Sequence, residues 1–240
     1  MNPDPLFPPA PALSGVQACI VDLDGTLVDT LDDFVAALAG MAAELGLPAP
    51  DRDQVRGWVG KGSEHLIRSV LSSVSGSDAA ERLFEPAWNA YQTHYRRING
   101  RHAELYAGAT QGLERLRGQG LRLACLTNKP TEFARELLAS KGIADHFEFV
   151  FGGDAFARRK PDPLPVRETC RHLGTQAART LVVGDSMNDA QAARQAGCPV
   201  VLVTYGYNHG QPVRAVDADA YIDSLADLPQ LLLPSSASLS

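Results

Sequence analysis

The 240-residue sequence lacks the long hydrophobic runs that membrane-spanning helices need. A helix that crosses a bilayer takes about 20 consecutive apolar residues, and no segment approaches that length. The first eleven residues also lack the basic start and apolar core of a signal peptide, so we expect a cytoplasmic protein with no membrane partner. An excess of basic residues is missing too, because 22 Lys and Arg oppose 28 Asp and Glu. The net charge of −6 argues against a nucleic-acid partner.

Cysteine is scarce, and its spacing excludes the common paired metal sites. The four cysteines are Cys19, Cys125, Cys170 and Cys198. Three of them lie in or beside expected apolar strands, where a thiol behaves as a small apolar side chain. We therefore expect buried free thiols, although an even count would permit disulfides.

What the sequence does contain is an ordinary globular composition, with 45% hydrophobic and 21% charged residues. The length suits one large domain, or a core domain with a smaller insert. Short apolar runs alternate with amphipathic helices, a pattern that predicts an α/β fold with a doubly wound parallel sheet. The expected strands are 16–23, 121–127, 148–152, 180–184 and 199–203, and the helices that follow include 130–140, 163–173 and 188–196.

Residues 32–104 interrupt this alternation with helical periodicity and no convincing strand. The apolar residues of its first helix recur at helical spacing: Phe34, Leu38, Met41, Ala42 and Leu45. Because the segment directly follows the first strand, we expect a helical cap over the sheet edge where ligands bind.

The remaining residues divide into a core and two flexible ends. The first residues carry five prolines, which neither a strand nor a helix absorbs. The last residues are rich in serine. The expected division is a leader at 1–14, a core at 15–31 and 105–233, a cap at 32–104 and a tail at 234–240.

Two aspartates lie where the first expected strand meets a glycine. Residues i and i+2 of a strand point to the same side, so the side chains of Asp22 and Asp24 converge at the strand's end. This arrangement suits a metal and a phosphate. Taken alone, it is also compatible with an apolar strand that an ordinary Asp-Gly turn closes.

Three later segments place polar side chains at the same edge. Thr127 and Asn128 end the second strand, Lys160 precedes a rigid Pro-x-Pro corner, and Asp185 and Asp189 follow another strand. Each also has a purely structural explanation. Thr127 can cap a helix, a solitary lysine is normally solvated, and Asp189 can complement a helix dipole.

These four strand-end motifs, in this order, resemble those of the haloacid dehalogenase-like phosphatase superfamily. The resemblance covers about residues 16–233 and implies a Rossmann-like core with a C1-type helical cap between the first two motifs. The runs 184–189, 196–199 and 204–208 look like the phosphoglycolate phosphatase family in particular. Residues 58–62 are similar to that family's cap signature.

The resemblance implies a Mg²⁺-dependent phosphate monoester hydrolase that acts through an aspartyl-phosphate. It makes Asp22 the nucleophile and Asp24 the general acid and base, roles that need different protonation states. The implied Mg²⁺ ligands are the Asp22 side chain, the Asp24 backbone carbonyl and Asp185. Asp189 would be either a further ligand or the residue that orients Lys160. Hard oxygen ligands beside a phosphate are what Mg²⁺ prefers.

The same resemblance assigns four residues to the substrate phosphate. Thr127 would donate its hydroxyl, Asn128 follows it in the usual place, and the Lys160 ammonium would offset negative charge. Gly25 would line a turn whose backbone amides bind phosphate oxygens.

The cap contributes the glycine-flanked lysine of Gly60-Lys61-Gly62. Two glycines make a flexible tip that could reach the substrate, or an ordinary loop between helices. Lys61 occupies a position that often holds a small polar residue, and a cation near a substrate carboxylate is chemically reasonable. On this hypothesis Lys61→Ala raises KM for phosphoglycolate more than for a neutral aryl phosphate.

Asp24 separates the reactions of the superfamily, because dehalogenases and phosphonoacetaldehyde hydrolases carry other residues at that position. We therefore expect phosphate-ester chemistry on a small phosphorylated metabolite. The phosphoglycolate phosphatase resemblance implies 2-phosphoglycolate as the substrate, with another small sugar phosphate as the alternative. A β-phosphoglucomutase-like isomerase and a catalytically silent binding module remain as alternatives. The sequence leaves open whether the chain is a monomer or a homodimer.

Overall fold

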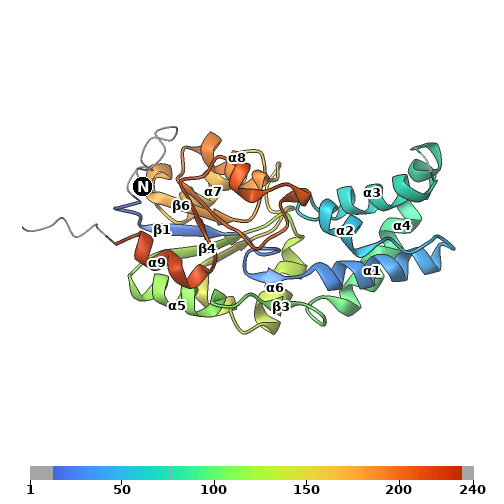
Figure 1. Ribbon diagram of the computed structural model, residues 1–240, viewed down its shortest axis with the longest axis horizontal. Coiled ribbons are helices and arrows are strands. Elements are labelled where there is room, and N and C mark those ends of the chain that lie inside the picture. The colour runs from blue at the N-terminus through green and yellow to red at the C-terminus, as the bar shows by residue number, and fades with distance from the viewer. Residues whose placement is uncertain (1–12, 76, 234–240) are drawn as a thin grey trace, which may run out of the picture.

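A six-stranded parallel sheet forms the centre of the computed structural model, which describes residues 13–75 and 77–233 (Figure 1). Its strand order is β5-β4-β1-β6-β7-β8. The strands are β1 (Ala18–Val21), β4 (Arg122–Leu126), β5 (Phe149–Phe151), β6 (Thr180–Gly184), β7 (Val200–Val203) and β8 (Ala220–Ile222). The five strands expected from the sequence are present and parallel. The sequence analysis missed β8, which is short and only partly buried at the sheet edge.

Helices cover both faces of the sheet because successive strand residues point to opposite sides. Cys19 and Val21 of β1 join one apolar cluster, whereas Ala18 and Ile20 join the other. Helices α5 (Ala109–Gly118), α6 (Thr131–Ser140) and α9 (Leu228–Leu231) pack on the first face, and α7 (Leu164–His172) and α8 (Met187–Ala196) on the second (Figure 1). Burying each large apolar side chain in these clusters contributes about 1.5–3 kcal/mol to stability. Helices on both faces of a parallel sheet confirm the predicted doubly wound core.

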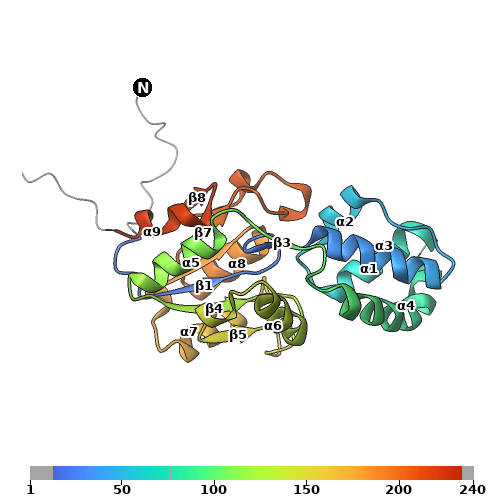
Figure 2. The ribbon, with the colours of Figure 1, turned by 90° about the horizontal axis from the view of Figure 1, so that it is seen from below.

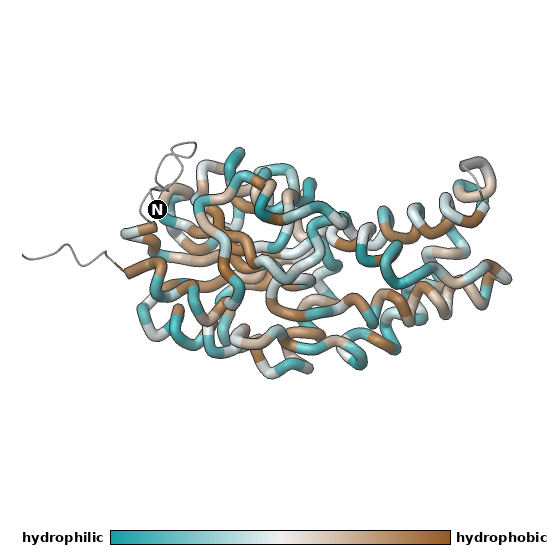
Figure 3. The backbone as a smooth tube through the Cα atoms, viewed as in Figure 1, coloured by the Kyte–Doolittle hydropathy of each residue, from teal (hydrophilic) through white to brown (hydrophobic). Residues whose placement is uncertain are grey.

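The expected helical cap is a separate lobe beside the core (Figure 2). Its helices are α1 (Leu31–Glu44), α2 (Arg52–Trp58), α3 (Ser63–Ser75) and α4 (Ser77–Ile98). They share an apolar cluster that includes Leu38, Met41 and Tyr91, and Phe133 of the core packs into it. Figure 3 shows hydrophobic residues concentrated in the central strands and along stretches of the cap helices. The cap therefore has its own apolar cluster, and Phe133 connects that cluster to the sheet domain.

A short antiparallel ribbon joins the two lobes, formed by β2 (Val28–Asp29) and β3 (Glu104–Leu105). The sequence analysis missed this ribbon and placed Glu104 in the cap, because two-residue strands leave no periodic pattern. Asp33, fully buried, accepts hydrogen bonds from the backbone amides of Gly100 (2.6 Å) and His102 (2.8 Å). These bonds fix where the chain enters and leaves the cap.

The described residues contain five short 3₁₀ helices as well, at Ala144–His146, Ala177–Arg179, Asn208–Gly210, Val213–Ala215 and Leu225–Asp227. All four cysteines are buried and free, as predicted. Within 13–75 and 77–233, no helix has both the length and the apolar character to cross a membrane. Most of the expected leader and the whole tail lie outside the described residues, but Leu13 packs against the core.

Candidate active site

The polar strand ends meet at one edge of the sheet. Asp22 follows β1, Thr127 follows β4 and Asp185 follows β6, and β4 and β6 are the two neighbours of β1. The chain runs outward from β1 to either side, which makes this edge a topological switch point. Parallel sheets bind ligands at such a place, beyond the carboxyl ends of the strands.

Three carboxylates and one ammonium form the buried centre of this edge. Asp22, Asp185 and Asp189 each offer an oxygen within 4.8 Å of the others. Lys160 places its Nζ 2.9 Å from Asp22 Oδ1 and 2.6 Å from Asp189 Oδ1, and donates to the Leu126 carbonyl at 2.8 Å. The sequence analysis left open whether Asp189 orients Lys160, and this contact places the two in direct partnership.

Asp189 also holds the start of α8. Its Oδ2 accepts from the Ser186 backbone amide at 3.2 Å and from the Ser186 hydroxyl at 2.8 Å, a reciprocal cap at the helix N-terminus. The helix-dipole explanation and the Lys160 explanation therefore both apply, one to each carboxylate oxygen.

Burial dominates the electrostatics of the cluster. It raises the pKa of Asp22 to about 7, against the opposing effect of the Lys160 ammonium. Burial also raises the pKa of Asp185 well above its usual range, and the charges of Asp189 and Asp22 add to this effect. Burial alone would lower the pKa of Lys160, but the attraction of Asp189 and Asp22 raises it. Three crowded carboxyl groups thus share one compensating ammonium.

This donor set fits a hard divalent cation. Three carboxylates against one ammonium leave two negative charges when all four groups are ionised, which a divalent cation would neutralise. Asp22 Oδ1 has the Lys160 ion pair at 2.9 Å but no hydrogen bond of good geometry among the described residues, so it keeps a lone pair for a cation. Asp185 is fixed by the backbone amide of Tyr207, which donates to its Oδ2 at 2.7 Å. The residues present therefore fit a metal site.

Two glycines leave room for Asp185. A Cβ atom at Gly25 or at Gly206 would overlap the Asp185 carboxylate. Gly25 also has a φ of +84°, which L side chains rarely adopt. The Gly25 amide donates to the Val28 carbonyl, and the Thr26 amide donates to the Leu23 carbonyl. Gly25 therefore allows the close approach of the turn to Asp185, and its part in binding the substrate phosphate stays a prediction.

We expect Gly206→Ala to weaken metal binding, because the new methyl group must displace Asp185. A shift of this buried carboxylate should lower the affinity for Mg²⁺ by about 10- to 100-fold. Titration calorimetry measures the change, with Gly118→Ala as the control, since a Cβ there meets nothing within 4 Å. Equal Mg²⁺ affinities in Gly206→Ala and the wild type would contradict this prediction.

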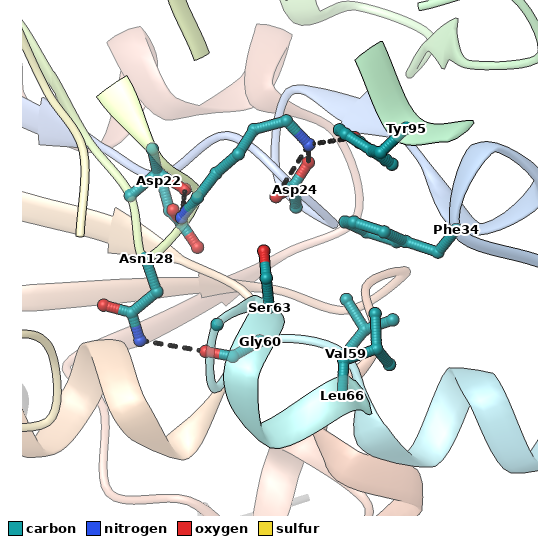
Figure 4. A pocket seen from close by; sticks show the side chains of 12 residues that line it. Asp22, Asp24, Phe34, Val59, Gly60, Ser63, Leu66, Tyr95 and Asn128 are labelled. Atoms are coloured by element: carbon teal, nitrogen blue, oxygen red, sulfur yellow. Dashed lines mark hydrogen bonds and ion pairs between the residues drawn. The ribbon is translucent and has the colours of Figure 1, made fainter. Parts of the chain in front are cut away.

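Thr127 and Asn128 lie at the cluster as predicted, but the Asn128 side chain is already engaged. Its amide donates to the carbonyls of Gly60 and Lys160, both at 2.9 Å. Asn128 therefore ties the cap to the Lys160 loop, as the dashed line to Gly60 in Figure 4 shows. The Thr127 hydroxyl accepts from the Lys129 amide at 3.3 Å, and the residue lines the cavity beside Asp22.

The cap tip reaches the core through backbone rather than through Lys61. The Gly60 carbonyl accepts hydrogen bonds from two side-chain amides, that of Asn128 at 2.9 Å and that of Asn188 at 3.1 Å. Gly60 and Gly62 have φ values of +104° and +89° and line the cavity. Lys61 between them is exposed and is not among the lining residues.

A small cavity of about 30 Å³ lies between cap and core (Figure 4). Asp22, Asp24 and Ser63 form its polar part, and the Ser63 hydroxyl points toward the aspartates. The apolar wall comes from the cap, and its members are Phe34, Val59, Leu66 and Tyr95. The cavity therefore has an anionic end on the core and an apolar end under the cap.

Sequence analysis missed the lysine of this cavity. Lys129 is only 4% exposed, and its Nζ lies 3.0 Å from Asp24 Oδ1 and 2.5 Å from the Tyr95 hydroxyl. It follows Thr127 and Asn128 directly, and that position was the only signal that could have found it. Tyr95 both packs in the cap and lines the cavity.

A family model described as haloacid dehalogenase-like hydrolase matches residues 19–203, more than half of the chain. Together with the fold, this match places the chain in the haloacid dehalogenase-like hydrolase family, so it is an enzyme of that class. The superfamily resemblance seen in the sequence is confirmed.

Several relatives within that family are named phosphoglycolate phosphatase. The chain is 42% identical over 212 residues to the phosphoglycolate phosphatase of Thiobacillus denitrificans, covering 88% of this chain and 93% of that protein. It is 44% identical over 218 residues to a plasmid phosphoglycolate phosphatase of Cupriavidus necator, covering 91% and 94%. A crystal structure of a predicted phosphoglycolate phosphatase from Haemophilus somnus superposes with a TM-score of 0.85 at 30% identity, covering 91% and 98%.

Proposed function

We propose that this protein is a Mg²⁺-dependent phosphatase that converts 2-phosphoglycolate to glycolate and phosphate. The observation that carries the proposal is the cluster of Asp22, Asp185, Asp189 and Lys160 at the switch point of the sheet. The relatives that cover nearly the whole chain at 42–44% identity support the choice of substrate.

In the proposed reaction, Asp22 attacks phosphorus and forms an aspartyl-phosphate as the glycolate oxygen leaves. Asp22 Oδ1 has no hydrogen-bond partner of good geometry among the described residues, so a lone pair is available for attack. Lys160 remains beside the nucleophile at 2.9 Å and offsets the charge of the phosphate. Bound Mg²⁺ would be held by Asp22, the Asp24 carbonyl, Asp185 and, directly or through water, Asp189, and would neutralise phosphate charge.

Asp24 acts as the general acid and base in this proposal. It lies two residues after Asp22 and lines the same cavity, where the leaving oxygen of a bound ester would lie. It donates a proton to that oxygen in the first half-reaction. It then removes a proton from the water that attacks the aspartyl-phosphate, which releases phosphate and restores Asp22.

The lining of the cavity favours a leaving group with few hydroxyl groups. The apolar cap wall of Phe34, Val59 and Leu66 faces the aspartates across a cavity of about 30 Å³, and it offers few polar partners for the hydroxyl groups of a sugar. Phosphatase activity on another small ester is the alternative that keeps the same mechanism. A β-phosphoglucomutase-like isomerase would need a sugar bisphosphate, and release of phosphate without one would exclude it.

Removal of the metal should abolish this activity. Treatment with EDTA leaves the carboxylate cluster without its counter-charge, so we expect turnover to fall to background and to return with Mg²⁺. The cation should also stabilise the fold by about 2.7 kcal/mol at 100 times its dissociation constant. Thermal unfolding with and without Mg²⁺ measures this effect independently of activity. Full activity in EDTA would contradict the metal-dependent proposal.

A further inference from the structure

The cavity contains a lysine, Lys129, that has no role in the proposed chemistry. Of the described residues that line the cavity, Lys129 alone has a positively charged side chain. It is nearly fully buried, and Lys160 already serves Asp22 and Asp189 at the other side of the cluster. A buried ammonium is costly unless it is paired, and the partner of Lys129 is Asp24, the residue that would meet the leaving oxygen of the ester.

Residues from both lobes hold the Lys129 ammonium in place. On the core side it contacts both oxygens of Asp24, at 3.0 and 3.3 Å. On the cap side the Tyr95 hydroxyl accepts at 2.5 Å, and the rings of Phe34 and Tyr95 lie 4.7 and 4.9 Å from Nζ. Figure 4 shows Asp24, Tyr95 and Phe34 gathered at this end of the cavity. An ammonium has three donors, and Asp24 and Tyr95 are its two hydrogen-bonding partners among the described residues.

We propose that Lys129 is the specificity-determining residue that binds the carboxylate of the substrate. This inference rests on the proposed function, because it places the leaving oxygen of the ester beside Asp24. The Lys129 ammonium lies 3.0 Å from the Asp24 carboxyl group. In 2-phosphoglycolate only one CH₂ group separates the ester oxygen from the carboxyl carbon. A substrate whose ester oxygen meets Asp24 therefore brings its carboxylate to Lys129.

The site selects a chemical class, namely phosphate esters of 2-hydroxy acids. A charge-assisted hydrogen bond in a small, partly apolar cavity is worth more than the same bond in water. An ester that lacks the carboxylate leaves the ammonium with no new partner. The exposed Lys61, which the sequence suggested for this role, does not line the cavity.

The experiment compares two esters of nearly equal size, 2-phosphoglycolate and its uncharged amide, 2-phosphoglycolamide. We expect wild-type kcat/KM to favour the acid, and Lys129→Met to lower that preference on the order of 10²-fold. Using the ratio separates recognition from any effect on Asp24, which would slow both esters alike. Arg135→Met is the matched control, because it removes one exposed positive charge from the outside of α6 and should leave the ratio unchanged.

A second variant keeps the test decisive if Lys129→Met fails to fold. Tyr95→Phe removes only the hydroxyl that holds the ammonium, and we expect it to lower the same preference about 5-fold. An unchanged ratio in the folded Lys129→Met, or in Tyr95→Phe if Lys129→Met does not fold, would overturn the assignment. So would a loss of preference in Lys61→Ala instead. A wild-type enzyme that hydrolyses neither ester would refute the proposed function itself, whereas a wild-type preference that survives in Lys129→Met refutes only the role of Lys129.

Discussion

Asp22→Asn is expected to lower kcat for 2-phosphoglycolate by about 10⁴-fold or more, because an amide does not attack phosphorus. The substitution keeps the size of the side chain and removes one of three crowded carboxylates. We therefore expect the variant to fold with a thermal midpoint close to that of the wild type. Steady-state phosphate release measures the loss of turnover, and circular dichroism verifies the fold.

The control for this variant is Asp145→Asn, which makes the same change on an exposed residue outside the cluster and should keep full activity. Acid-quenched wild-type enzyme should also carry a phosphoryl group on Asp22, which mass spectrometry detects. Near-normal turnover in Asp22→Asn would rule out the covalent mechanism.

Lys160→Met is expected to impair both stability and catalysis. Lys160 is 4% exposed and contacts Asp22, Asp189 and the Leu126 carbonyl. Without its ammonium, Asp22 and Asp189 lose the buried counter-charge that both of them contact, and breaking such a pair costs about 3–5 kcal/mol. Urea unfolding in EDTA measures that cost. We expect kcat/KM to fall by about 10²- to 10³-fold as well, because phosphate and nucleophile then repel each other.

Two comparison variants separate these effects. Lys141→Met removes an ammonium that binds the neutral carbonyls of Gly100 and Ala103, so it should cost some stability and leave turnover intact. Lys160→Met combined with Asp189→Asn removes an uncompensated charge and should regain part of the stability but not the activity. Wild-type stability and activity in Lys160→Met would show that the cluster does not depend on this lysine.

The regular parts of this fold could be predicted because their signals are local. Continuous apolar runs such as Thr180–Gly184 and the helical spacing of Phe34, Leu38 and Met41 appear directly in the sequence. Strand β8 and the β2–β3 ribbon could not be predicted, because two or three partly buried residues show no period. Their pairing depends on the chain's overall course.

The candidate site likewise contains residues that the sequence predicts and contacts that it does not. Asp22, Asp24, Lys160, Asp185 and Asp189 stand in motifs with fixed spacing, and the structure brings them together. The contact of Lys129 with Tyr95 joins residues 34 positions apart on different lobes, so nothing in the local sequence marks it.

The surroundings of Gly25 could not be predicted from the sequence either. Gly25 indicated a phosphate-binding turn from its neighbours, but the close approach to Asp185 arises only when β1 and β6 lie side by side. Sequence patterns identify which side chains reach the edge of the sheet. They do not show which partners those side chains then find.

The central claim is the hydrolysis of 2-phosphoglycolate, and its most direct test is phosphate release with Mg²⁺ across a substrate panel. The panel holds 2-phosphoglycolate, several sugar phosphates, pyrophosphate and an aryl phosphate, compared by kcat/KM. We predict a value for 2-phosphoglycolate at least about 10²-fold above the others, or roughly 2.7 kcal/mol of discrimination. A flat profile would contradict the substrate assignment, and no release from any ester would contradict the phosphatase itself.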